Sequence, residues 1–226
     1  MKTILSLRKI FALSVLFVFS LSMSAQTVRV ELGWAGSSMR YHNPKVPSID
    51  FFGSNANNFQ CAVAVDYLNY RWFDLTSEIG YIRKGGKEKD ILTDAMGISQ
   101  KGSARLNLDY LTLNTMFNVK YDFNGITPYI GVGPRLDFKV GSSESYENLD
   151  LENSGNPLAS FHSNAVIFGW KCAAGVRVLI SPSFQVGLHF SYLPSFTDAY
   201  RHKETGVWLR DGKNFTLGIS LGYVIR

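Results

Sequence analysis

The chain has 226 residues, of which 46% are hydrophobic and 18% are charged, and its 23 basic and 18 acidic side chains give a formal net charge of +5. This length suits a single domain, and the basic residues are too few and too scattered to favour a nucleic-acid-binding protein. We therefore expect no nucleic-acid partner.

A targeting segment opens the sequence. Three basic residues precede a short apolar core at residues 10–21, and small residues follow up to Ala25. This order is typical of a secretory signal peptide, and the core is shorter than the roughly 20 apolar residues of a membrane-spanning helix. We predict a cleaved signal peptide over residues 1–25 and a mature domain over residues 26–226. Without the three basic residues of the signal, the net charge falls to 20 − 18 = +2.

The mature chain alternates between apolar and polar residues in eight segments, and the connections between them are alternately short and long. Successive side chains of a strand point to opposite faces, so this period of two predicts β-strands. Short turns that alternate with long polar loops are typical of an up-and-down outer-membrane barrel, with the turns on the periplasmic side. The expected strands span residues 27–39, 59–70, 72–84, 104–122, 127–141, 164–180, 183–193 and 214–226.

The clearest hairpin lies between residues 106 and 140. Asn124-Gly125 stands between two alternating runs, which is the strongest short-range signal for a two-residue turn. Each arm has one apolar face and one polar, glycine-rich face, and each is longer than the about 5–6 residues usual for strands of globular proteins. Such arms suit the about 9–11 residues of a tilted strand that crosses a bilayer.

Short motifs in and before this hairpin resemble those of a known family. The run DYLTLN from Asp109 is followed by PYIGVGP from Pro128, and YIRKGG from Tyr81 precedes both. Together they resemble the PorT-like outer-membrane β-barrel family, although Asn114 stands where that family often has proline. The resemblance implies a structural or interaction role in the envelope, or participation in a secretion apparatus. The implied partners are outer-membrane lipid and proteins of the envelope or of a secretion system.

Alternation alone leaves two folds open, because a soluble barrel would point its apolar face inward. The strand glycines fall on the polar face, and a crowded concave interior needs small residues whereas a solvent-facing wall gains nothing from them. Cys61 and Cys172 fall on the apolar face of well-separated strands, so we expect free cysteines. The favoured fold is all-β, an eight-stranded antiparallel up-and-down transmembrane β-barrel in the outer membrane of a Gram-negative cell envelope.

The polar face then lines the interior of the barrel. An eight-stranded barrel is only just wide enough for its own side chains, and buried charges are tolerated only when they are paired. We therefore expect a structural salt-bridge network that plugs the lumen, with Glu78 or Asp74 as the partner of Arg135. By parity the network comprises Arg29, Glu31, Asp66, Asp74, Glu78, Lys120, Arg135, Asp137, Lys171 and Arg177.

Candidate chemistry is sparse. His189 and Ser191 come nearest to a base–nucleophile pair, which leaves a lipid-modifying enzyme as one alternative function. A narrow transporter of small solutes is another. His42, His162 and His202 lie in or beside the predicted outer loops, without the spacing of a known metal site. We expect no catalytic residue, cofactor or metal, and a role carried by the outer loops.

Overall fold

The structure is a computed structural model that describes residues 27–42, 52–89, 103–147, 162–202 and 206–225. The predicted signal peptide over residues 1–25 lies outside these described residues. Within them, the regular structure is a single β-sheet. In the same ranges, no helix has the length and apolar character needed to cross a membrane.

Eight of the strands are long and two have only two residues each. The long strands are β1 (Thr27–His42), β2 (Ser54–Tyr67), β3 (Phe73–Lys89), β4 (Ser103–Lys120), β5 (Ile126–Glu147), β7 (Val166–Ser181), β8 (Phe184–Tyr192) and β10 (Trp208–Val224). The two short strands are β6 (His162–Ser163) and β9 (Tyr200–Arg201).

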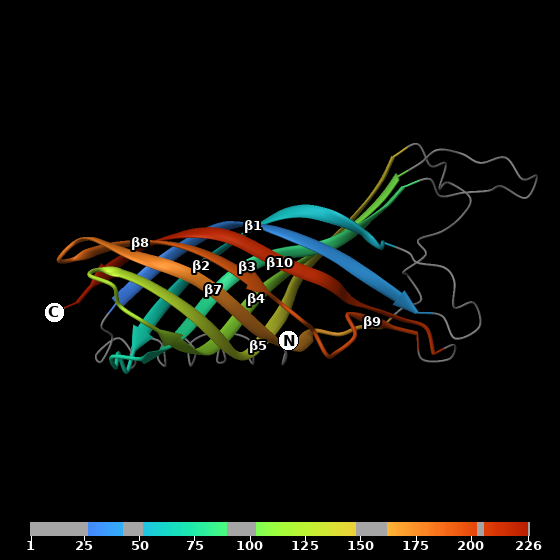
Figure 1. Ribbon diagram of the computed structural model, residues 1–226. Coiled ribbons are helices and arrows are strands. Elements are labelled where there is room, and N and C mark those ends of the chain that lie inside the picture. Colours follow the sequence, from blue (N-terminus) through green and yellow to red (C-terminus); the bar gives the residue numbers. More distant parts are fainter. Residues whose placement is uncertain (1–26, 43–51, 90–102, 148–161, 203–205, 226) are drawn as a thin grey trace, which may run out of the picture.

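Each long strand pairs antiparallel with the long strands that precede and follow it in the chain (Figure 1). The first long strand also pairs with the last, from Thr27↔Val224 to His42↔Trp208. The predicted all-β, antiparallel, up-and-down arrangement of about eight strands is thereby confirmed.

The predicted hairpin turn between β4 and β5 is confirmed as well. Asn124 and Gly125 have φ values of 56° and 89°, and Phe123 and Ile126 bridge the strand ends on either side of them. Positive φ at both central residues is characteristic of a type I′ turn, whose twist matches that of the flanking strands. Asparagine and glycine tolerate this left-handed backbone better than other residues do.

The sheet has two different ends. The turn end carries the short connections at residues 68–72, 121–125 and 182–183, and the rim end carries the opposite ends of the strands. At the rim end the strands run further than predicted: β3 continues to Lys89, β5 continues to Glu147, and β10 begins at Trp208. These added stretches are polar and lack the apolar alternation that predicts a strand, yet their backbones pair. Figure 1 shows the rim-end parts of β3, β4 and β5 extending together, apart from the rim ends of β1 and β10.

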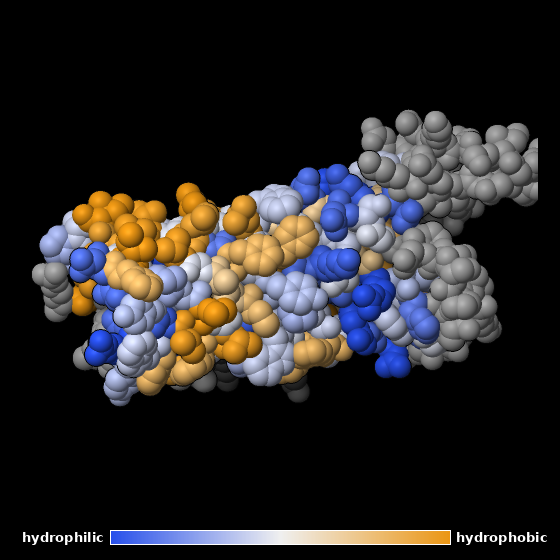
Figure 2. Space-filling model, viewed as in Figure 1, coloured by the Kyte–Doolittle hydropathy of each residue, from blue (hydrophilic) through white to orange (hydrophobic). Residues whose placement is uncertain are grey.

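Apolar side chains cover the outer face of the sheet, as predicted. Along β4 every even-numbered residue from Ala104 to Asn118 is buried, whereas Phe117 and Val119 are 44% and 53% exposed. Aromatic rings contact one another near the turn end, where the ring centres of Trp72 and Tyr121 lie 5.1 Å apart. Figure 2 shows apolar side chains gathered toward the turn end of the displayed face and hydrophilic ones toward the rim end. The two cysteines are free, as expected.

The inner face, which carries the buried side chains, is divided along the strands. Its rim-end part is a largely apolar cluster formed by Ala35, Met39, Phe52, Ile82, Ala104, Leu106, Leu108, Tyr110, Ile167, Leu193, Ala199, Tyr200 and Leu209. Nearer the turn end the strands carry glycines and charged residues instead. At Gly133 a side chain would overlap the carbonyl oxygen of Thr115, so only glycine fits against that neighbouring strand.

Candidate functional site

The ten charged residues predicted for the interior all lie on the inner face. Nine of them are buried, and the side chain of Lys120, nearest the turn end, is 10% exposed. They come from six strands, and each of them makes at least one ion pair. The sheet therefore brings together charges that are far apart in the sequence, and they fall into three groups.

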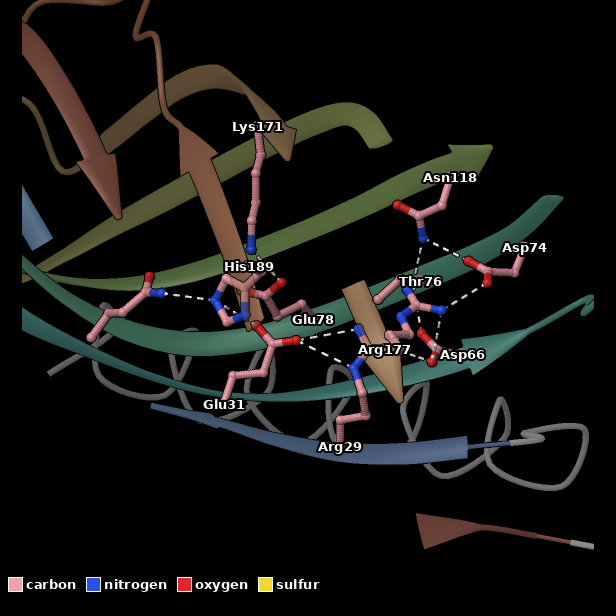
Figure 3. Close-up of polar contacts among 11 residues, drawn as sticks. Arg29, Glu31, Asp66, Asp74, Thr76, Glu78, Asn118, Lys171, Arg177 and His189 are labelled. Carbon is pink, nitrogen blue, oxygen red and sulfur yellow. Dashed lines mark hydrogen bonds and ion pairs between the residues drawn. The ribbon is translucent and has the colours of Figure 1, made fainter. Parts of the chain in front are cut away.

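The turn-end group consists of Arg29, Asp66, Asp74, Lys120 and Arg177. Arg177 Nη1 lies 2.8 Å from Asp74 Oδ2 and 3.6 Å from Asp66 Oδ2. Lys120 Nζ lies 3.2 Å from Asp74 Oδ2, and Arg29 donates a hydrogen bond to Asp66. Each carboxylate is thus shared between two cations, and Figure 3 shows Arg177 between Asp74 and Asp66.

Neutral donors complete the coordination of these two carboxylates. Thr76 Oγ1 donates to Asp66 Oδ1 at 2.6 Å, and Asn118 Nδ2 donates to Asp74 Oδ1 at 2.6 Å. Removing a charge from water costs several kcal/mol, and this cost is offset only when the remaining lone pairs also find donors. The group is built to hold its charges in place inside the sheet.

The middle group consists of Glu31, Glu78, Lys171 and His189. Lys171 Nζ lies 2.5 Å from Glu78 Oε2, which spans the interior from β7 to β3. Arg29 Nη2 lies 3.2 Å from Glu31 Oε1 and so links this group to the turn-end group. His189 Nε2 lies 3.6 Å from Glu31 Oε2. The two groups form one continuous polar cluster, as Figure 3 shows.

The rim group consists of Lys84, Arg135, Asp137 and Asp211. Lys84 Nζ lies 2.7 Å from Asp137 Oδ2 and 2.9 Å from Asp211 Oδ2, and these three side chains have no exposed area. Arg135 Nε lies 3.0 Å from Asp137 Oδ2. The hydroxyl group of Ser195 accepts from Arg135 Nη2 at 2.8 Å and donates to Asp211 Oδ2 at 2.8 Å, which fastens the segment after β8 to this group.

The predicted partners of Arg135 were wrong. Glu78 pairs with Lys171, Asp74 pairs with Arg177 and Lys120, and Arg135 pairs with Asp137, two residues along its own strand. Residues two apart on a strand share a face, so Asp137 is the nearest carboxylate to the guanidinium group. Room for the arginine comes from Gly169, where a Cβ atom would lie 2.9 Å from Arg135 Nη2.

Two members of the rim group were missed by the sequence analysis. Lys84 was placed at the end of its predicted strand, and Asp211 was placed in an outer loop. Lys84 has the same parity as Asp74 and Glu78 and already lies within the predicted strand, so the parity rule alone would have included it. With these two, the described residues place six bases and six acids in the interior: Arg29, Lys84, Lys120, Arg135, Lys171 and Arg177 against Glu31, Asp66, Asp74, Glu78, Asp137 and Asp211.

His189 and Ser191 do not form a hydrogen-bonded pair. His189 Nε2 lies 3.5 Å from Gln60 Nε2, and Ser191 Oγ has no hydrogen-bond partner among the described residues. Both side chains are buried on the inner face. In the described ranges, no three His, Cys, Asp or Glu side chains converge as metal ligands, and the ring of His42 stacks on Trp208 at 4.9 Å.

Comparison with known proteins places this arrangement in a family. Residues 9–201 match the family described as outer membrane protein beta-barrel domain. No curated protein matches the chain.

Several solved outer-membrane proteins are similar in fold. OprG from Pseudomonas aeruginosa is 12% identical with a TM-score of 0.50, covering 89% of this chain and 98% of its own. Neisserial surface protein A is 13% identical with a TM-score of 0.44, covering 88% of this chain and 97% of its own. Outer membrane protein W of E. coli is 14% identical with a TM-score of 0.45, covering 89% of this chain and 99% of its own.

Proposed function

This chain belongs to the outer membrane protein β-barrel family and lies in the outer membrane, and from this premise we propose that it is an eight-stranded barrel plugged by its three ion groups. In this proposal β1 and β10 close the barrel, and outer-membrane lipid surrounds its apolar face. The protein has a structural or interaction role in the envelope, and it acts through its rim end. It is neither an enzyme nor an open channel.

The observation that carries the proposal is the balance of the buried charges. In the described part of the chain, six bases and six acids occupy the inner face at three successive levels, and most of their ion pairs join different strands. An eight-stranded barrel leaves little space beyond its own side chains. A solute on its way through would have to part these pairs, and parting a buried pair costs about 3–5 kcal/mol.

The rim end supports a role in recognition. There β3, β4 and β5 continue beyond the level of the ion groups, to Lys89, Ser103 and Glu147. Function concentrates on the segments that a rigid scaffold holds at its edge. The resemblance to PorT-like proteins favours a partner from the envelope or from a secretion apparatus, and we propose this class of partner for the rim.

Conductance in planar bilayers tests the plug. We expect the wild-type protein to give no steady current above the bare bilayer, and the variant Arg135→Ala to give a measurable one, because the rim group is then broken. A large, steady wild-type conductance would favour the narrow transporter instead. For the enzyme alternative, we expect the double variant His189→Ala/Ser191→Ala to leave the lipid composition of the outer membrane unchanged.

Photo-crosslinking tests the role of the rim. A crosslinking amino acid at Ser142, which is exposed near the end of β5, should capture a discrete envelope protein in cells. The same amino acid at Leu68, which is 50% exposed at the turn end, is the matched control and should not capture that protein. Absence of any specific product at Ser142 and at other rim positions would contradict the interaction role.

A further inference from the structure

A group of cations on the outer face of β1 and β10, at the rim end, has no role in the ion network. Arg40 and Lys213 are exposed, and in the described part of the chain neither of them makes an ion pair. Arg40 lies directly opposite Arg210 across the two strands. Like charges that face each other on neighbouring strands destabilise a sheet, so an anion bound beside Arg40, in addition to the Asp198 carboxylate that pairs with Arg210, would stabilise this arrangement.

An irregularity in β10 places these cations on one face. Ser37 pairs with Asn214 and Met39 pairs with Asp211, so β10 has one residue more than β1 between these two pairs. Such a bulge reverses the alternation of the bulged strand. Lys213 and Arg210, three residues apart, therefore both point outward, while Asp211 points inward to the rim group.

The neighbourhood of the group is predominantly positive. Arg210 Nη2 lies 2.8 Å from Asp198 Oδ1, and its guanidinium group lies 4.9 Å from the centre of the Trp208 ring. Arg201 of β9 is exposed and pairs with Trp208 across the strands. Among the described residues, the carboxylate of Asp198 is thus the one acidic group that pairs with any of these four cations. The patch, which is made of Arg40, Arg201, Arg210 and Lys213, therefore carries a net positive charge.

The patch borders the lipid-facing belt. Trp34 is 42% exposed, and its ring centre lies 5.3 Å from that of Phe215. Phe215 follows Lys213 by two residues on β10, so this aromatic pair lies slightly closer to the turn end than Lys213 does. Exposed aromatic rings of this kind mark the level of the lipid headgroups. In an up-and-down barrel of the outer membrane the short turns lie on the periplasmic side, so the rim end lies on the extracellular side. The patch therefore lies at the headgroups of the outer leaflet.

We infer that the cationic patch on β1, β9 and β10 binds the phosphate groups of an outer-leaflet phosphorylated glycolipid. Arginine presents a planar fork of donors that matches phosphate in two-point contact, and Lys213 adds a fourth charge beside the three arginines. A phosphorylated sugar headgroup supplies several anions over the width of two strands, which suits cations spread over both.

The neighbouring strands β2 and β3 provide a matched contrast on the same outer face. There Tyr81 and Phe59 form an aromatic pair at 5.4 Å, and Arg83 lies two residues beyond Tyr81 on the same strand. Arg83 Nε, however, lies 2.6 Å from Asp109 Oδ1, which also accepts from the hydroxyl group of Tyr81. This arginine is neutralised within the protein, so it should contribute little to the binding of an anion.

The test is a titration of the purified full-length protein in neutral detergent with a diphosphorylated glycolipid, followed by native mass spectrometry. The double variant Arg40→Gln/Lys213→Gln should bind roughly fivefold more weakly for each lost charge, hence roughly 25-fold in all. Arg83→Gln should bind like the wild type. The dephosphorylated glycolipid should not bind, phosphatidylglycerol should bind at least roughly tenfold more weakly, and raising sodium chloride should weaken wild-type binding.

Stability separates this role from a structural one. Because Arg40 faces Arg210, its removal should leave the unfolding transition unchanged or raise it. Equal affinity of the double variant and the wild type would overturn the inference, as would an equal loss in Arg83→Gln. Equally tight binding of phosphatidylglycerol would overturn the assignment to a glycolipid. If the double variant does not fold, salt-independent binding by the wild type would still refute it.

Discussion

Replacing Lys84 with methionine removes the cation that two buried carboxylates share. Its ammonium group lies 2.7 Å from Asp137 and 2.9 Å from Asp211, in a site without exposed area. After the substitution, the Arg135–Asp137 ion pair is the only one that these two carboxylates keep among the described residues, and Asp211 keeps a hydrogen bond from the Ser195 hydroxyl group. One buried negative charge is then uncompensated, so we expect a loss of about 3–5 kcal/mol in the free energy of unfolding.

The matched control is Arg83→Met. Arg83 forms an ion pair of 2.6 Å with Asp109, but its side chain is 36% exposed, so we expect a loss of only about 0–1 kcal/mol. The free energies can be measured by urea unfolding in lipid vesicles, followed by tryptophan fluorescence. The double variant Lys84→Met/Asp211→Asn restores the charge balance and should be more stable than Lys84→Met by about 1–3 kcal/mol. Equal losses for Lys84→Met and Arg83→Met, or no recovery in the double variant, would refute the reasoning.

Two further predictions concern the assembly of the sheet, and both can be read from the fraction of protein that keeps its folded gel mobility without heating. Gly133→Ala should abolish this fraction, because the new Cβ atom would overlap the carbonyl oxygen of Thr115, whereas Gly141→Ala meets only the Asp109 carboxylate and should be tolerated. Deleting residues 222–226 should also abolish it, since β1 would lose three of its pairings with β10.

The sequence was sufficient to predict which face of each strand is buried. Alternation is a local property with a period of two, so Phe117 and Asn118 of β4 could be assigned to opposite faces without knowledge of their neighbours. The same local rule placed ten charged residues on the inner face. The two-residue turn at Asn124-Gly125 was equally accessible, because its backbone conformation depends on those two residues alone.

The pairing of the charges could not be predicted in the same way. Which carboxylate meets Lys171 across the interior depends on the tilt of the strands and on which glycines open space there, and neither is encoded within one strand. Strand ends at the rim were underestimated for a related reason. Residues 141–147 carry no apolar alternation, and only their pairing with β4 keeps them extended.

The bulge in β10 lets Asp211 and Asn214, three residues apart, both point inward, while Arg210 and Lys213 both point outward. Continuing the alternation backward from Asn214 through both Lys213 and Gly212 would turn Gly212 inward and Asp211 outward, so parity would have placed Asp211 on the wrong face had the predicted strand reached it. Deleting Gly212 removes the extra residue, and plain alternation over the shortened strand then turns Lys213 outward, Asp211 inward and Arg210 outward, as in the wild type. We therefore expect the deletion variant to keep the ion pairs of Lys84, without the loss of about 3–5 kcal/mol that a broken buried pair causes, and to keep glycolipid binding. Gly212→Ala keeps the residue count and meets only the movable Ser38 hydroxyl group and nearby backbone, at 2.7 Å and beyond, so it should retain binding. A loss of both stability and binding in the deletion variant, with Gly212→Ala unaffected, would show that the backbone conformation of the bulge, and not the alternation of the strand, separates the inner charges from the outer ones.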